Sequence, residues 1–255
     1  MKNKYLNNLF ISLGLLLLLV GCASHPTHSP ENVHWSYDGD TGPNQWGGLC
    51  DEYCLADEGK AQSPVDLTQG DTHTESLGFD YKPSMLNLVN NGHTIQQNMS
   101  GGSFTIDGEA YKFLQFHFHS ASEHTVAGKR YDMEIHLVHQ NDEGEYAVLG
   151  VLLEEGEENA FLKSFFDDLP TQADQVVKSD EVMLDVSELF PENSPLFTYW
   201  GSLTTPPCTE GVHWYIFQKP VTLSTAQLKS FRDIYQGNFR PVRDLNDRKI
   251  EMVQP

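Results

Sequence analysis

The sequence predicts a single β-rich domain with a few surface helices. Short runs of alternating apolar and polar residues recur along the chain, and turn residues bound them, which is typical of strands. Apolar residues at helical spacing occur in only two segments. After Val33 there is no second linker rich in Pro, Gly and Ser, no internal repeat and no low-complexity block. Residues 33–255 are therefore expected to form one domain.

The composition supports a folded core and excludes two classes of protein. The 255 residues include 39% hydrophobic and 11% aromatic residues with only 20% charged, which argues against a disordered chain. They carry 16 Lys and Arg against 36 Asp and Glu, a formal net charge of −20. Binding to nucleic acid needs a basic face, so we expect no nucleic-acid partner.

The first 21 residues are predicted to be a cleaved signal peptide. Lys2 and Lys4 precede the apolar run 9–20, which is too short to cross a bilayer that needs ~20 apolar residues. Residues 19–22 (LVGC) resemble the lipobox of bacterial lipoproteins, which implies cleavage before Cys22 and lipidation of that cysteine.

We therefore expect an exported protein, anchored by lipid to a bacterial membrane and facing the periplasm or the cell exterior. The alternative is a soluble periplasmic protein. Residues 22–32 lack periodicity and are predicted to be a flexible tether. Removing residues 1–21 takes away two lysines and no acids, so the mature net charge is −22.

The predicted elements can be placed along the domain. The strand pattern is clearest over residues 103–106, 111–119, 133–139, 147–153 and 213–217. One helix is predicted over Asn159–Leu169, where five apolar residues share a side before Pro170. A second is predicted over Ser224–Tyr235, with Ser224 as its cap. Both are expected to be surface helices on a sheet.

Two of these strands carry histidines in a pattern that indicates a metal site. Side chains alternate faces along a strand, so His117 and His119 project together while Phe116 and Phe118 enter the core. His136 lies on the strand 133–139, and antiparallel pairing in the right register would bring the three imidazoles around one point. Three His ligands with an open fourth position are typical of catalytic zinc.

A histidine on an apolar face is more often a core residue held by hydrogen bonds, so further observations are needed. Gln115 and Glu134 each stand two residues before a histidine of the set, and metal-bound histidines commonly donate their second N–H to such a group. His124 and His139 lack this context and are expected to be buried structural residues.

Many separate motifs show that the sequence resembles the α-class carbonic anhydrases. The matching stretches run from residue 34 to about 241 and stand in the family's order: 34–37 (HWSY), 42–46 (GPNQW), 62–67 (QSPVDL), 90–93 (NNGH), 115–119 (QFHFH), 122–126 (SEHTV), 134–139 (EIHLVH), 147–150 (AVLG) and 202–208 (SLTTPPC). The resemblance implies a large, twisted, mostly antiparallel central sheet with short peripheral helices and a zinc ion in a conical cleft.

The resemblance also implies the reaction, a zinc-dependent reversible hydration of CO2 to bicarbonate and a proton. The zinc ligands would be His117, His119 and His136. Thr204 matches the family's gatekeeper, which orients the attacking zinc-hydroxide through the carboxylate that matches Glu123. His93 matches the proton shuttle, and a histidine titrates near neutrality as that role requires. Gln115 and Glu134 would accept hydrogen bonds from the ligand imidazoles and would not bind the zinc themselves.

The same resemblance assigns the two sides of the cleft. The apolar side, where CO2 would lie beside the nucleophile, comprises Val138, Val148, Leu203, Val212 and Trp214, with Thr204 and Thr205 next to it. The wet side comprises Asn91 and Gln96 together with Gln115 and Thr205. Sulfonamides and anions are the inhibitors that the family leads us to expect.

The cysteines depart from the family pattern. Exported bacterial relatives usually join an N-terminal cysteine to the one that matches Cys208, but this chain has Ala56 where they place the first. We expect a disulfide between Cys54 and Cys208, with Cys50 as the other candidate partner. The leftover Cys50 would be free or available to join two chains, so a homodimer is one form to consider.

Two other functions compete with this interpretation. His117 and His119 with Glu123 match half of the motif of cupin metal proteins, in which the glutamate is a ligand, but the cupin glycines and second histidine motif are missing. A carbonic-anhydrase-like domain that has lost activity and serves in binding is the third reading. Such domains generally lose a zinc histidine, and none is lost here.

Overall fold

The computed structural model describes residues 33–99 and 101–254. Its strands are β1 (Asp66–Leu67), β2 (Thr72–His73), β3 (Leu77–Tyr81), β4 (Ser84–Asn90), β5 (Ile95–Asn98), β6 (Gly102–Ile106), β7 (Glu109–His119), β8 (Thr125–Val126), β9 (Lys129–Arg130), β10 (Met133–Gln140), β11 (Tyr146–Glu155), β12 (Val176–Leu184), β13 (Leu196–Ser202), β14 (Glu210–Phe217), β15 (Val221–Leu223) and β16 (Glu251–Val253). The helices are α1 (Leu55–Glu58), α2 (Ala160–Phe166) and α3 (Thr225–Arg232). Short 3-10 turns are η2 (Gly39–Thr41), η3 (Trp46–Gly48), η4 (Asp51–Tyr53) and η5 (Val186–Leu189).

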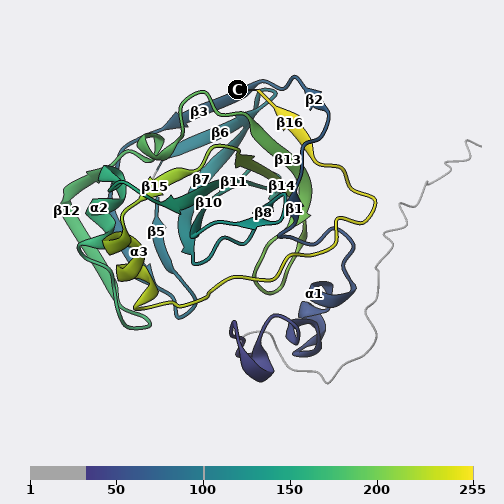
Figure 1. The fold of residues 1–255 in the computed structure, drawn as a ribbon, viewed down its shortest axis with the longest axis horizontal. Coiled ribbons are helices and arrows are strands. Elements are labelled where there is room, and N and C mark those ends of the chain that lie inside the picture. The colour runs from purple at the N-terminus through teal and green to yellow at the C-terminus, as the bar shows by residue number, and fades with distance from the viewer. Residues whose placement is uncertain (1–32, 100, 255) are drawn as a thin grey trace, which may run out of the picture.

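A 13-stranded sheet runs through the molecule (Figure 1). Its main path has the order β12-β4-β5-β7-β10-β11-β14-β13-β16-β2, with β3, β6 and β15 attached beside it. Most neighbours are antiparallel, but β11 pairs in parallel with β14 and β15, and β16 with β2. The prediction of a large, mostly antiparallel sheet with short peripheral helices is confirmed. β7 and β10 are inner strands of this path, so both are held by ladders on two sides.

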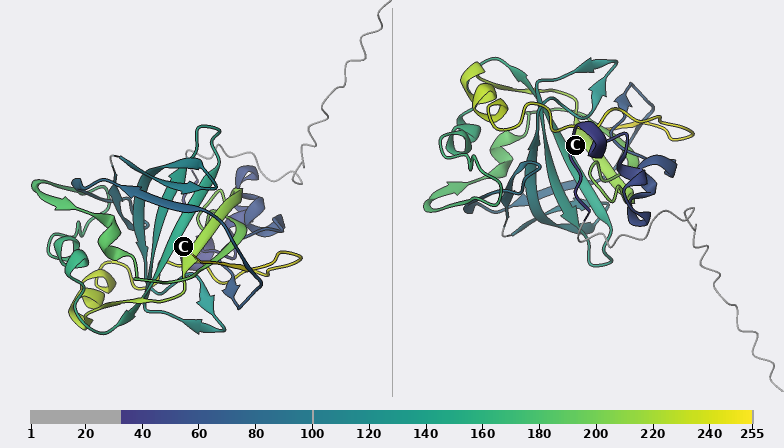
Figure 2. Two further views of the ribbon diagram at one scale, coloured as in Figure 1. Left: turned by 90° about the horizontal axis from the view of Figure 1, so that it is seen from above. Right: turned by 90° about the horizontal axis from the view of Figure 1, so that it is seen from below.

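The predicted helices are present and shorter than expected. α2 begins after Asn159, whose side chain accepts a hydrogen bond from the backbone N–H of Leu162. α3 begins after Ser224, which forms a reciprocal capping box with Gln227. Both helices end before the predicted boundary, although Leu169 and Tyr235 still pack against the core. Figure 2 shows the two helices together on one side of the sheet.

The main core lies between one sheet face and these helices. Phe116 and Phe118 of β7 are fully buried, and their rings lie 5.3 and 6.1 Å from that of Phe165 in α2. Phe118 also lies 5.8 Å from Phe231 of α3. Because these side chains fill one face of β7, the alternate residues face the other side. This alternation leaves His117 and His119 on the face away from the main core.

Several predictions fall on residues outside the described part of the chain. The signal peptide, the lipidation site Cys22 and the tether all precede residue 33. Within residues 33–99 and 101–254, no helix is long and apolar enough to cross a membrane.

Candidate metal centre and active site

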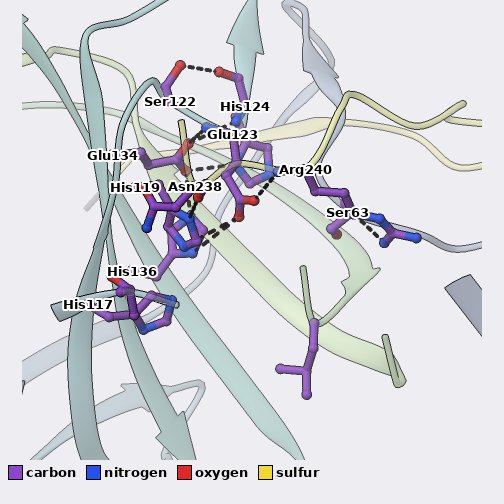
Figure 3. Close-up of polar contacts among 12 residues, drawn as sticks. Ser63, His117, His119, Ser122, Glu123, His124, Glu134, His136, Asn238 and Arg240 are labelled. Atoms are coloured by element: carbon purple, nitrogen blue, oxygen red, sulfur yellow. Dashed lines mark hydrogen bonds and ion pairs between the residues drawn. The ribbon is translucent and has the colours of Figure 1, made fainter. Parts of the chain in front are cut away.

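The pairing of β7 with β10 brings the three histidines together. The strands are antiparallel, and His136 stands directly opposite His117. The register gives Glu134 the position opposite His119. Donor atoms of His117, His119 and His136 all lie within 4.8 Å of one another. Figure 3 shows the side chains of His117, His119 and His136 close together beside these strands.

Each of these imidazoles has one nitrogen committed to a protein acceptor. Nδ1 of His117 lies 2.9 Å from Oε1 of Gln115, and Nδ1 of His119 lies 2.7 Å from the main-chain oxygen of Asn238. Nε2 of His136 lies 2.9 Å from Oε1 of Glu134. An acceptor on one nitrogen fixes the tautomer and leaves the other nitrogen unprotonated for a ligand bond.

Two orphaned polar atoms fit a cation bound at this place. Nε2 of His119 and Oε2 of Glu123 are buried and have no hydrogen-bond partner among the described residues. They lie 3.5 Å apart, and Oε2 of Glu123 is 3.8 Å from Nδ1 of His136. Buried polar atoms are rarely left unpaired without a reason. Three neutral nitrogen donors around one space fit a zinc ion.

Burial keeps the histidines neutral. It lowers the pKa of His119 to about 4 and lowers the pKa values of His117 and His136 as well. A neutral imidazole is the form that binds a metal ion.

Glu134 and Glu123 differ in their electrostatic setting although both are buried. Burial acts to raise the pKa of Glu134, but the neighbouring His124 and His136 bring it well below the ordinary value. Burial raises the pKa of Glu123 to about 7, against the opposing effects of His136 and the nearby Thr204 hydroxyl. Oε1 of Glu123 accepts a hydrogen bond from the backbone N–H of Arg240 at 2.7 Å. Glu123 is thus held in place from a segment far along the chain.

One cavity beside the histidines is lined mainly by apolar side chains. It has a volume of about 240 Å³, and Val138, Val148, Leu203 and Trp214 line it together with Thr204, Thr205, Gln115, His117 and His136. Val212 is not among its lining residues; it is 1% exposed and packs in the buried cluster that contains Trp214. Leu114 and Tyr146 also line this cavity, and neither was predicted to do so.

A second, polar cavity meets the first at Gln115, His117 and Thr205. It has a volume of about 130 Å³ and contains the predicted wet-side residues Asn91 and Gln96, with His93 and His119. Trp35, Tyr37 and Thr94 line it too and were not predicted to do so. The oxygen Oδ1 of Asn91 is already used, since it accepts hydrogen bonds from the backbone N–H groups of His93 and Thr94.

The His93 ring lies flat against Trp35. The ring centroids are 3.7 Å apart and the planes differ by 6°. Burial, followed by the charge of His34, lowers the pKa of His93. His93 also borders a neighbouring cavity of about 270 Å³ that reaches His34. The ring therefore stands between the polar side of the metal centre and a more external space.

The predicted Cys54–Cys208 disulfide is wrong. Cys208 is a free, buried thiol, as is Cys50. Cys208 packs in a buried cluster with Trp46 and Ala56, so the residue that faces it is the alanine standing at the family's cysteine position. Burial raises the pKa of Cys208 to about 11.

His124 and His139 are fully buried, as expected for structural residues. Nδ1 of His124 lies 2.7 Å from Oε1 of Glu134, and its Nε2 lies 2.6 Å from the Tyr199 hydroxyl. His139 is on the core side of β10, where its Nε2 lies 2.9 Å from the Tyr81 hydroxyl.

The fold and the site together define a class of protein, a mainly β enzyme built around a three-histidine centre between an apolar and a polar cavity. A model of the eukaryotic-type carbonic anhydrase family matches residues 41–254. The carbonic anhydrase of Nostoc sp. is 38% identical over 256 residues, which cover 96% of this chain and 97% of that protein. The carbonic anhydrase of Klebsiella pneumoniae is 42% identical over 222 residues, which cover 85% and 90%.

A solved structure agrees with these relatives. The complex of α-carbonic anhydrase from Thermovibrio ammonificans with the inhibitor sulfanilamide superposes with a TM-score of 0.83 at 41% identity, covering 86% of this chain and 99% of that one. The chain belongs to the carbonic anhydrase family, and its activity is the reversible hydration of CO2 to bicarbonate and a proton. Membership in this family excludes the cupin alternative.

Proposed function

We propose that the chain hydrates CO2 with a zinc ion held by His117, His119 and His136. The observation that carries this proposal is the convergence of three nitrogen donors whose partner nitrogens are already occupied by Gln115, Asn238 and Glu134. When bound, zinc supplies a Lewis acid that lowers the pKa of water and so provides hydroxide near neutral pH.

In this proposal Glu123 and Thr204 orient the nucleophile. A bound zinc ion would favour the ionised form of Glu123, and an ionised carboxylate can only accept hydrogen bonds, whereas a hydroxyl both donates and accepts. The Thr204 hydroxyl would therefore donate to Glu123 and accept a hydrogen bond from the hydroxide, which turns a lone pair toward the substrate. Arg240 supports this direction, because its backbone N–H already occupies the other oxygen of Glu123.

The apolar cavity is the proposed place for CO2. Its apolar lining consists of Val138, Val148, Leu203 and Trp214, which hold water poorly. CO2 has no dipole moment, so it would displace this poorly held water. Thr204 and Thr205 lie at the junction with the polar residues, where charge develops on the product.

His93 is proposed to carry the proton away from the site. It lines the same polar cavity as His117 and His119, so ordered water could connect it with the nucleophile. Its lowered pKa keeps the imidazole neutral near pH 7 and ready to accept a proton. The external cavity beside His34 then gives the protonated ring access to buffer.

We further propose that the mature protein is exported and held at a bacterial membrane by lipid on Cys22, the basis being the lipobox-like residues 19–22. Sulfonamides are proposed as inhibitors, since the α-carbonic anhydrase of Thermovibrio ammonificans forms a complex with sulfanilamide.

Stopped-flow measurement of CO2 hydration, combined with metal analysis of the same sample, tests the proposal. We expect one zinc per chain and hydration that falls when zinc is removed by a chelator and returns when zinc is restored. Stoichiometric iron in a preparation with no hydration activity would overturn it.

A further inference from the structure

Asn238 joins the metal centre to the proposed proton shuttle. Its main-chain oxygen accepts the Nδ1–H of His119 at 2.7 Å, as described above. Its side chain reaches in another direction, where Nδ2 donates to the main-chain oxygen of His93 at 3.1 Å. The residue is 2% exposed, so water does not compete for these contacts.

The same amide also fixes the end of the strand that carries two of the histidines. Nδ2 of Asn238 donates to the main-chain oxygen of Phe118 at 2.9 Å, and Oδ1 accepts from the backbone N–H of Ser120 at 2.9 Å. The backbone N–H of Asn238 donates in turn to the oxygen of Ser120 at 3.1 Å. Every hydrogen-bonding group of Asn238 is thus used at one junction.

The junction lies beyond the end of the β5–β7 ladder, where the sheet no longer joins the segment of His93 to the end of β7. The ladder between β5 and β7 begins at Gln96 opposite His117, so His93 stands outside it. Beyond the ladder, Thr94 reaches the Phe118 oxygen with its hydroxyl, and Asn238 reaches both Phe118 and His93. Of these two side chains, Asn238 is the one that contacts His93 itself.

We infer that Asn238 is a positioning residue for proton transfer, which sets the His93 backbone relative to His119 through its side-chain amide. The inference rests on the proposed shuttle role of His93. Loss of the amide would free the His93 backbone to shift, while the main-chain contact to His119 would remain. The step that depends on His93 should therefore suffer more than the step at the metal.

Asn238→Ala tests the inference, with Asn141→Ala as the matched control. Asn141 is also buried and uses its amide to hold a turn, but that turn joins β10 to β11 away from His93. Stopped-flow hydration is measured over a range of buffer concentrations. For Asn238→Ala we expect kcat to fall roughly tenfold, within the ~100-fold that a 1 Å misplacement can cost, while kcat/KM and zinc content stay within about twofold. Asn141→Ala should change neither kinetic constant.

The double variant His93→Ala/Asn238→Ala separates a positioning role from general damage. If Asn238 acts through His93, the double variant has the kcat of His93→Ala alone. Multiplying effects, or an equal loss of kcat and kcat/KM in Asn238→Ala, would overturn the inference. Should Asn238→Ala fold poorly, Asn238→Ser provides the second variant. Inactivity of the unmodified enzyme would instead refute the proposed function, and an unchanged His93→Ala would refute the shuttle.

Discussion

Oε1 of Glu134 lies 2.9 Å from Nε2 of His136, and this contact determines that Nδ1 of His136 faces His117 and His119. The other oxygen of Glu134 accepts hydrogen bonds from the backbone N–H groups of Glu123 and His124, each at 2.8 Å. One carboxylate therefore orients a ring of the proposed metal site and holds the segment that carries Glu123.

Glu134→Gln should weaken zinc binding, because the amide offers a single oxygen for the positions that two oxygens now fill. We expect a loss of about 10- to 100-fold in zinc affinity. Competition with a chelator of known affinity measures it. Glu154→Gln, at an exposed position paired with Lys129, is the control and should bind zinc as the unmodified protein does. Equal affinities for the two variants would contradict the orienting role.

Thr204→Ala should slow hydration while leaving the zinc content unchanged. Without the hydroxyl, Glu123 loses its link to the nucleophile, and removal of one such preorganised group typically costs about 100-fold. Thr204→Ser keeps the hydroxyl and should retain most of the rate. Stopped-flow values of kcat/KM decide the matter, and similar values for the two variants would remove Thr204 from this role.

His93→Ala should lower kcat at low buffer concentration, because the proposed proton acceptor is gone. Added imidazole should restore the rate by carrying the proton in its place. The value of kcat/KM should hardly change, since the apolar cavity and the three-histidine centre are untouched. A variant that keeps the full rate in dilute buffer would show that protons leave by another route.

Ala56→Cys should form the disulfide that this chain lacks, since Ala56 packs against the free thiol of Cys208 in the same buried cluster. A bridge that closes so long a loop typically stabilises a protein by about 2–4 kcal/mol. Thiol titration of the unfolded oxidised protein should find one reactive thiol fewer than in Ala56→Ser, and urea unfolding should report the gain. Unchanged thiol numbers would show that the two positions do not face each other closely enough.

His139 should make the fold sensitive to acid. Burial lowers the pKa of His139 to about 3, whereas an unfolded histidine titrates near 6.5. Between these values the unfolded chain binds a proton that the folded chain does not, so stability rises with pH by about 1.4 kcal/mol per unit. The contribution is complete above pH ~6.5 and is lost progressively as the pH falls toward 3.

His139→Gln should lower by one the number of protons that the chain takes up on unfolding in this pH range, and so reduce the slope of stability against pH. The variant also disturbs the contact with Tyr81. Urea unfolding at several pH values between 4 and 7 gives the slope directly. His213→Gln should reduce the dependence in the same way, since burial also lowers the pKa of His213, to about 4. An unaltered slope in His139→Gln would mean that other groups dominate acid unfolding.

The regular part of the site could be predicted from sequence because strand periodicity fixes faces. The alternation of Phe and His over residues 116–119 decided which side chains enter the core, and the partner strand followed the same rule. Gln115 and Glu134 could be predicted as partners of the histidines because each stands two residues before one of them. Residues two apart lie on the same face of any strand.

The irregular part could not be predicted in this way. Asn238 and Arg240 come from a segment without regular structure, and only the tertiary fold brings them to His119 and Glu123. Leu114 escaped prediction because the pairing of β7 with β10 shifts register beside it, which interrupts simple alternation. The disulfide prediction failed for a similar reason, since distance along the chain does not say which residue packs against Cys208, and in the fold that residue is Ala56.

The stacking of His93 on Trp35 has a practical consequence for anyone who attaches this enzyme to a carrier. Trp35 is the third residue of the described domain. A rigid fusion or surface bond just before residue 33 would therefore restrict the space around the stacked Trp35 and His93 rings, where the proton is proposed to leave. Attachment through the C-terminal strand β16, which pairs with β13 and β2 and lines neither cavity, leaves that exit open. An immobilised catalyst joined at its C-terminal end should therefore keep more of its turnover than one joined at residue 33.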